Sequence, residues 1–148
     1  MRTGTRTARQ TERREQAVVV RWARLNRDVY PELTWLFAIP NGGRREAREA
    51  QLLKAEGVTP GVADLCLLWS NGTHPCLWIE MKSATGSLRP EQRAFRQWAL
   101  DQGHLATVAY SAEEAIATIR RYIGRENIGE FSGHSVMAVD HDRAVGGR

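Results

Sequence analysis

The segment GVADLCLLWSNGTHPCLWIEMKS, residues 61–83, decides the fold of this chain. It contains two apolar runs, Val62–Trp69 and Pro75–Met81, which are joined by the turn-forming residues SNGTH. Two such runs separated by a short loop with Asn and Gly are typical of a β-hairpin. Because both runs are apolar at odd and even positions alike, we expect two central strands that are covered on both faces of a sheet.

The length of the hairpin loop determines which residues face each other across the two strands. A three-residue loop centred on Gly72 places Asp64 opposite Glu80. A two-residue loop would shift the register by one residue and turn Asp64 to the other face of the sheet. Three-residue loops are common when a glycine can adopt the left-handed conformation, so Gly72 favours the first register, although it is the middle residue of the loop.

Three elements are expected before the hairpin. Apolar residues at helical spacing predict a helix that begins at Thr11 as N-cap and ends before Pro31. Its expected buried stripe is Val18, Val19, Trp22 and Leu25. The apolar segment Leu33–Ile39 predicts a strand that runs into the turn PNGG. A second helix is predicted over Arg44–Glu56, because Gly57 follows it.

Three more elements are expected after the hairpin. A helix opens near Ser87, its candidate cap, tolerates Pro90 in its first turn and ends at Gly103, with Phe95 and Trp98 on its inner face. A strand follows over Leu105–Tyr110, and Ser111 caps a last helix that stops at Gly124. The apolar stripe of that helix is Ala115, Ile116, Ile119 and Ile123. The order α-β-α-β-β-α-β-α predicts an α/β domain with a central mixed sheet flanked by helices.

Length and composition indicate one folded domain. We expect residues 1–11 to be a flexible basic arm, residues 12–124 the domain, and residues 125–148 a loosely ordered tail. The two cysteines have no metal-ligand or disulfide spacing and are expected to be reduced core residues. Neither a bilayer-spanning apolar run nor a signal-peptide segment is present, so we expect a soluble, cytoplasmic protein.

The charge of the chain favours a polyanionic partner. Basic residues outnumber acidic ones by 21 to 17, which gives a net charge of +4. The basic residues are arginines except for Lys54 and Lys82, so a lysine is unusual in this chain. Two arginine clusters could contact phosphates, and a solvated helix face explains each of them equally well. They are Arg44, Arg45 and Arg48 after the PNGG turn, and Arg89, Arg93 and Arg96 after the hairpin.

Three charged residues of the hairpin are candidates for catalysis. Glu80 and Lys82 share one face of their strand, and Asp64 joins them in the first register. Facing carboxylates repel each other, and a divalent ion between them removes this conflict. Mg²⁺ or Mn²⁺ takes oxygen ligands and lowers the pKa of a bound water, and Lys82 could orient that water. An exposed Glu-Lys pair on an edge strand is the alternative, but the apolar character of both strand faces disfavours it.

In its ordered motifs the chain resembles the VRR-NUC domain (virus-type replication-repair nuclease), a branch of the PD-(D/E)xK nuclease superfamily. The motifs are a helix with Glu and Gln, then AIPNGG, LLKAEGVTPGVADL and WIEMKSATGSLRPEQ, and the resemblance spans about residues 12–123. It implies a restriction-endonuclease-like core and metal-dependent phosphodiester cleavage. Asp64 and Glu80 would be metal ligands, Lys82 the catalytic lysine and Gln92 a further residue of the catalytic face, and the carbonyl of Met81 would complete the ion's shell.

Two positions need separate comment. The superfamily's proline before the first acid is replaced by Ala63, and because that proline is a backbone device we expect little loss. The resemblance points to Glu12, four residues before Gln16, as a third metal carboxylate. Periodicity alone places Glu15 closer to the centre of the apolar stripe, and either glutamate could simply complement the helix dipole.

The expected function is therefore a Mg²⁺- or Mn²⁺-dependent DNA endonuclease without a small-molecule cofactor or a membrane partner. The resemblance implies a homodimer that resolves branched DNA such as Holliday junctions. A flap or single-strand nuclease with the same site, or a DNA-binding module without catalysis, are the alternatives.

Overall fold

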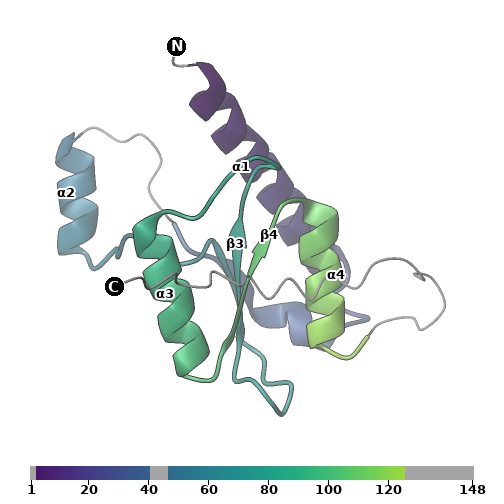
Figure 1. Ribbon diagram of the computed structural model, residues 1–148. Coiled ribbons are helices and arrows are strands. Elements are labelled where there is room, and N and C mark those ends of the chain that lie inside the picture. Colours follow the sequence, from purple (N-terminus) through teal and green to yellow (C-terminus); the bar gives the residue numbers. More distant parts are fainter. Residues whose placement is uncertain (1–2, 41–46, 126–148) are drawn as a thin grey trace, which may run out of the picture.

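The computed structural model of the protein describes residues 3–40 and 47–125. At its centre is a four-stranded sheet with the order β1-β2-β3-β4 (Figure 1). β1 pairs antiparallel with β2, β2 pairs antiparallel with β3, and β3 pairs parallel with β4. The strands are β1 Leu36–Ala38, β2 Leu65–Leu67, β3 Leu77–Met81 and β4 Leu105–Ala109. The sheet is therefore mixed, and the predicted hairpin strands are its two central ones.

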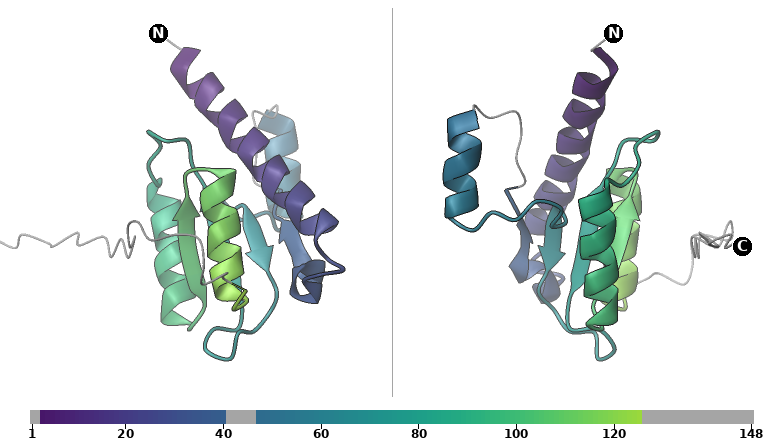
Figure 2. Two further views of the ribbon diagram at one scale, coloured as in Figure 1. Left: turned by 90° about the vertical axis from the view of Figure 1, so that its right-hand side faces the viewer. Right: turned by 60° about the vertical axis from the view of Figure 1, so that its left-hand side comes forward.

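Helices cover both faces of the sheet. The helices of the described residues are α1 Thr3–Leu25, the 3-10 helix η1 Pro31–Trp35, α2 Ala47–Ala55, α3 Pro90–Asp101 and α4 Ala112–Tyr122. α1 and α4 lie side by side on one face, and α3 packs against β4 on the other face (Figures 1 and 2). α2 lies to the side of this body. None of the described helices is long and apolar enough to cross a membrane.

The predicted register of the hairpin is confirmed. Leu65 lies opposite Ile79 and Cys66 opposite Trp78, so the next step places Asp64 opposite Glu80. The loop supports this register, because Asn71 Oδ1 accepts the N–H groups of Thr73 and His74 and Gly72 has a φ of 88°.

Successive side chains of the strands point to opposite faces of the sheet, and each face packs against different helices. Odd-numbered residues of β2 and β3 pack under α1 and α4, where Val19 and Ile119 are fully buried. Even-numbered residues face α3, where the ring of Phe95 meets the ring of Trp78 edge-on at 5.2 Å. Asp64 and Glu80 belong to this second face, so the site develops on the α3 side. Both cysteines are buried and free, as predicted.

The predicted start of the first helix at Thr11 is wrong. α1 begins at Thr3, and the hydroxyl of Thr11 donates to the carbonyl of Thr7 at 3.0 Å, so Thr11 is an interior helical residue. Residues 5–10 contain no proline, and their Arg, Ala and Gln are good helix formers that extend an already nucleated helix. The buried stripe also differs, because Val18 and Leu25 are exposed whereas Val19 and Ala23 are buried.

Two other boundaries differ from the predictions. Residues 31–35 form a 3-10 helix with Pro31 in its first turn, so only Leu36–Ala38 of the predicted strand pairs with β2. α3 begins at Pro90 with Arg89 rather than Ser87 at the cap, because proline is favoured at the first helical position. Trp98 is 66% exposed and lies outside the inner face of α3.

The last helix agrees with its prediction. Ser111 accepts the N–H of Glu114 at 3.1 Å, and α4 buries Ala115 and Ile119. The start of the second predicted helix at Arg44, and the tail from residue 126 onward, lie outside the described residues.

Candidate active site

Asp64, Glu80 and Lys82 come together where β2 begins and β3 ends. The side chains of Glu80 and Lys82 are buried, with only 6% and 8% of each residue exposed, and Lys82 Nζ lies 2.7 Å from Glu80 Oε1. Asp64 Oδ2 accepts the N–H of Met81 at 2.9 Å. The carbonyl of Asp64 accepts the N–H of Ile39, which ties the end of β1 to the site.

Gln92 fixes the orientation of Glu80 from the other side. It lies in the first turn of α3, where its Oε1 accepts the N–H of Arg89 at 2.9 Å and its Nε2 donates to Glu80 Oε1. One amide therefore closes the start of α3 and holds the carboxylate. Glu80 Oε1 consequently has two donors, Lys82 and Gln92.

The second oxygen of Glu80 has a different environment. Glu80 Oε2 is buried and has no hydrogen-bond partner in the described structure. Burial, followed by the negative charge of Asp64, raises the pKa of Glu80 to about 7, although Lys82 and Arg89 act in the opposite direction. Glu80 Oε2 is therefore available to a cation or to a hydrogen-bond donor.

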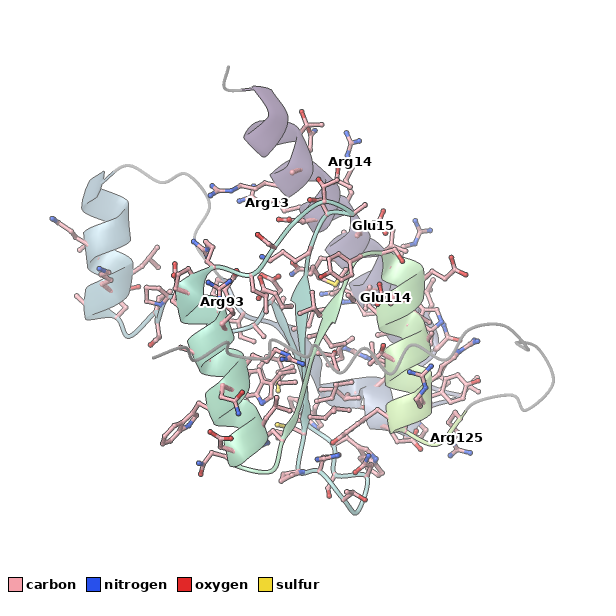
Figure 3. All side chains as sticks on the ribbon, viewed as in Figure 1. Arg13, Arg14, Glu15, Arg93, Glu114 and Arg125 are labelled. Carbon is pink, nitrogen blue, oxygen red and sulfur yellow. The ribbon has the colours of Figure 1, made fainter. Side chains whose placement is uncertain are left out.

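Glu12 and Glu15 both lie in α1, but their side chains contact different parts of the molecule. Glu12 Oε1 accepts the N–H of Ser83 at 3.0 Å, two residues after the end of β3. Glu15 Oε2 accepts the N–H of Ala112 at 2.6 Å and so caps the start of α4. Figure 3 shows Glu15 on the α4 side of α1. The geometry therefore favours Glu12 as the helix carboxylate of the site.

A cleft of about 1310 Å³ opens above these residues. One wall is α1, the floor is the end of the hairpin, and the other wall is the loop before α3. The predicted site residues Glu12, Asp64, Glu80, Lys82, Arg89 and Gln92 all line it, together with Gln16 and Ser83.

The predicted metal ligands do not form a compact cluster of three. Within residues 3–40 and 47–125, no three His, Cys, Asp or Glu side chains lie close enough to hold one ion. Asp64 and Glu80 are near neighbours on the floor of the cleft, whereas Glu12 belongs to the wall formed by α1. The roles of Glu12 and of the Met81 carbonyl as direct ligands stay predictions.

The predicted phosphate-binding arginines have different positions. Arg89 lines the cleft and forms a long ion pair with Glu91 at 3.5 Å. Arg93 donates to the carbonyl of Leu88, and Arg96 donates to the carbonyl of Ala106 at 3.2 Å. Arg44 and Arg45 lie outside the described residues, and Arg48 lies in α2 with an undescribed side chain.

Four arginines of α1 line the cleft without having been predicted as site residues, namely Arg9, Arg13, Arg21 and Arg24. A signal for the first two was present, because Arg9 and Arg13 are four residues apart and flank Glu12 and Gln16 on one helical face. Because residues 1–11 were predicted to be a flexible arm, this helical pattern was not recognised.

The comparisons with known proteins concern the family and the fold of the chain. The family model of the VRR-NUC domain matches residues 5–113. A solved structure described as a VRR_NUC domain protein is similar to this chain with a TM-score of 0.65 and 26% sequence identity, over 78% of this chain and 90% of that one. No curated protein matches the chain.

Proposed function

The chain belongs to the VRR-NUC domain family, which gives it a nuclease-type function, and from this premise we propose that it is a Mg²⁺- or Mn²⁺-dependent DNA endonuclease. The observation that carries the proposal is the pair of buried residues Glu80 and Lys82 beside the half-buried Asp64 at the floor of a wide cleft. A buried charge cluster of this kind opposes folding unless its groups are paired, so a partner for the free oxygen of Glu80 is expected.

The residues present fit a hard divalent cation. The orphaned Oε2 of Glu80 and the neighbouring Asp64 carboxylate are oxygen donors of the type that Mg²⁺ and Mn²⁺ prefer. Mg²⁺ is usually held by one or two carboxylates together with waters and substrate phosphates, so two protein carboxylates suffice. We propose that Asp64 and Glu80 hold the ion, with the carbonyl of Met81 as a further ligand. When bound, the ion would supply a Lewis acid that activates water and neutralises charge on the phosphate.

Lys82 and Gln92 perform the other tasks of the site. The ammonium of Lys82 is fixed by Glu80 Oε1, so it can donate to a non-bridging oxygen of the scissile phosphate and stabilise the charge that develops there. Gln92 holds the same carboxylate oxygen, so Oε2 would be the oxygen that binds the ion. Glu12 binds the N–H of Ser83 and keeps the end of the catalytic strand against α1.

We propose branched DNA, such as a four-way junction, as the substrate and a homodimer as the active form. A single domain of this size carries one set of Asp64, Glu80 and Lys82. Two symmetric cuts in a junction therefore require two copies related by a twofold axis.

Cleavage assays test the proposal. Labelled four-way junction, flap, single-stranded and linear duplex DNA are incubated with Mg²⁺, Mn²⁺ or chelator, and wild type is compared with Glu80→Gln and Lys82→Ala. We expect metal-dependent cutting by wild type alone, with DNA binding retained by both variants, whose folding is checked by thermal unfolding. Binding of DNA without cleavage under any ion would reject the nuclease proposal and favour a DNA-binding module.

The substrate and the oligomeric state need separate readouts. Preference for the junction over the other DNAs, together with a dimer in light scattering, supports the resolvase assignment. A monomer both alone and with junction DNA would reject that assignment and leave the chemistry of the site intact.

A further inference from the structure

The cleft wall formed by α1 carries positive charge that the catalytic residues do not use. Arg9, Arg13, Arg21 and Arg24 line this wall, and all four are exposed. We call these four residues the arginine row. The N-terminal half of α1 extends beyond the sheet, so the row continues past the catalytic residues (Figures 1 and 2).

The arginine row is not neutralised within the described part of the chain. No ion pair joins any of its members to a described acidic side chain. The acidic residue of α1 that lines the same wall, Glu12, accepts the N–H of Ser83 instead. Exposed guanidinium groups without acidic partners attract anions, and their planar forks match phosphate oxygens in a bidentate manner.

The dimensions of the row suit an extended polyanion. From the first to the last arginine the helix rises by about 22 Å at 1.5 Å per residue. One DNA strand carries a phosphate for about every 3.4 Å of duplex axis, so the row can follow several successive phosphates of one strand. Arg89 adds a positive charge on the opposite wall of the cleft.

We propose that the arginine row is a binding site for the phosphate backbone of the DNA strand that crosses the floor of the cleft. This inference rests on the proposed nuclease function, since it assigns the contacts that hold the substrate over Asp64 and Glu80. Backbone contacts of this kind give affinity and position without reading the base sequence.

The chain offers a matched control for this proposal. Arg14 lies on the same helix and is also exposed, but it does not line the cleft. Figure 3 shows Arg13 and Arg14 directed to opposite sides of α1. A charge effect that is merely global would treat Arg13 and Arg14 alike, whereas a local site would distinguish them.

The test measures the dissociation constant of a labelled DNA duplex in chelator over a series of salt concentrations. The proteins are full-length wild type, the double variant Arg9→Gln/Arg13→Gln, and the control Arg14→Gln. We expect weaker binding by the double variant and a slope of log K against log salt that is smaller by about 2, since each lost phosphate contact removes nearly one unit. The control keeps the wild-type affinity and slope.

Two outcomes would overturn the proposal. They are an unchanged slope in the double variant and an equal loss of affinity in Arg14→Gln. Because binding is measured in chelator, this result does not depend on catalysis. Failure of wild type to cut DNA with Mg²⁺ or Mn²⁺ would reject the nuclease proposal alone.

Discussion

At the scale of single residues, the two oxygens of Glu80 have opposite environments. Oε1 accepts hydrogen bonds from Lys82 and Gln92, and Oε2 is buried without a partner. The carboxylate is therefore oriented by the protein but incompletely satisfied by it. This combination suits a group that completes its interactions only when a ligand arrives.

The raised pKa of Glu80 predicts a pH dependence of stability for the metal-free protein. The pKa of Glu80 is about 7 in the folded state, against an ordinary value of 4.5 in the unfolded chain. Below pH 4.5 the carboxyl is therefore protonated in both states. Between these values the folded state keeps a proton that the unfolded state has lost, and stability falls as the pH rises. The loss is at most about 3 kcal/mol.

Urea unfolding in chelator from pH 4.5 to 8 measures this effect. The free energy of unfolding of wild type should decrease through this range relative to Glu80→Gln, which cannot titrate at this position. Parallel pH profiles for the two proteins would contradict the prediction.

Gln92 predicts a loss of activity that acts through another residue. Replacing Gln92 with Ala removes one of the two donors that orient Glu80 and should lower cleavage by about 10–100-fold, as is typical of groups that orient metal ligands. Raising the Mg²⁺ or Mn²⁺ concentration should restore part of the rate, which a purely structural role would not produce. Gln97→Ala is the control, because Gln97 lies in the same helix and bonds only to the exposed Asp101.

At the scale of elements, a close approach between a turn and α3 positions Asp64. Gly61 has a φ of 91°, and a Cβ added there would lie 2.5 Å from the carbonyl oxygen of Glu91. Gly61→Ala should destabilise the fold by about 3 kcal/mol, from strain and from the overlap with α3. Gly72 has a similar φ, but a Cβ added there would meet no atom within 4 Å. Gly72→Ala should therefore destabilise the fold by only about 1 kcal/mol. Equal midpoints of denaturant unfolding for the two variants would contradict the close approach.

The two glutamates of α1 predict two separable phenotypes. Glu15→Ala removes the acceptor of the Ala112 N–H and should destabilise the protein by about 1 kcal/mol, with DNA cleavage retained. Glu12→Ala should instead impair cleavage, since the end of the catalytic strand loses its contact with α1. Unfolding curves and cleavage rates on both variants measure these effects. If Glu15→Ala lost cleavage at a temperature where the variant is folded, Glu15 rather than Glu12 would be the helix carboxylate of the site.

At the scale of the whole molecule, ligand binding at one site should stabilise the entire domain. Mg²⁺ or Mn²⁺ that binds only the folded state at 100 times its dissociation constant adds about 2.7 kcal/mol to the free energy of unfolding. Thermal unfolding should therefore show a higher midpoint with the ion for wild type. Asp64→Asn and Glu80→Gln should lose this increase, and an equal increase in all three proteins would indicate binding elsewhere.

The sequence was sufficient for those parts of the fold that depend on apolar runs and turns. The hairpin register followed from the loop around Gly72, and this register alone brought Asp64 to Glu80. Ser111 predicted the start of α4 because its cap is local. In each case the physical determinant lies within a few residues of the feature.

Other features could not be predicted because they depend on distant contacts or on weak local signals. The first turns of α1 have no apolar periodicity, so their helical structure was not recognised and the arginine row was missed. The resemblance favoured Glu12 and the periodicity Glu15, but the different partners of these residues, Ser83 and Ala112, could not be predicted because they are far away in the sequence. Trp98 was assigned to the inner face because exposure of a large aromatic side chain leaves no mark in the sequence pattern.

The two halves of α1 have different roles, because the C-terminal half contributes to the core and the N-terminal half does not. Its C-terminal half carries Val19 and Ala23 in the core, while none of its described side chains before Val19 is buried. Substitutions in the N-terminal half therefore meet little resistance from folding. That half is a region where substrate preference can change over evolution while the domain keeps its stability, and where an engineer can begin.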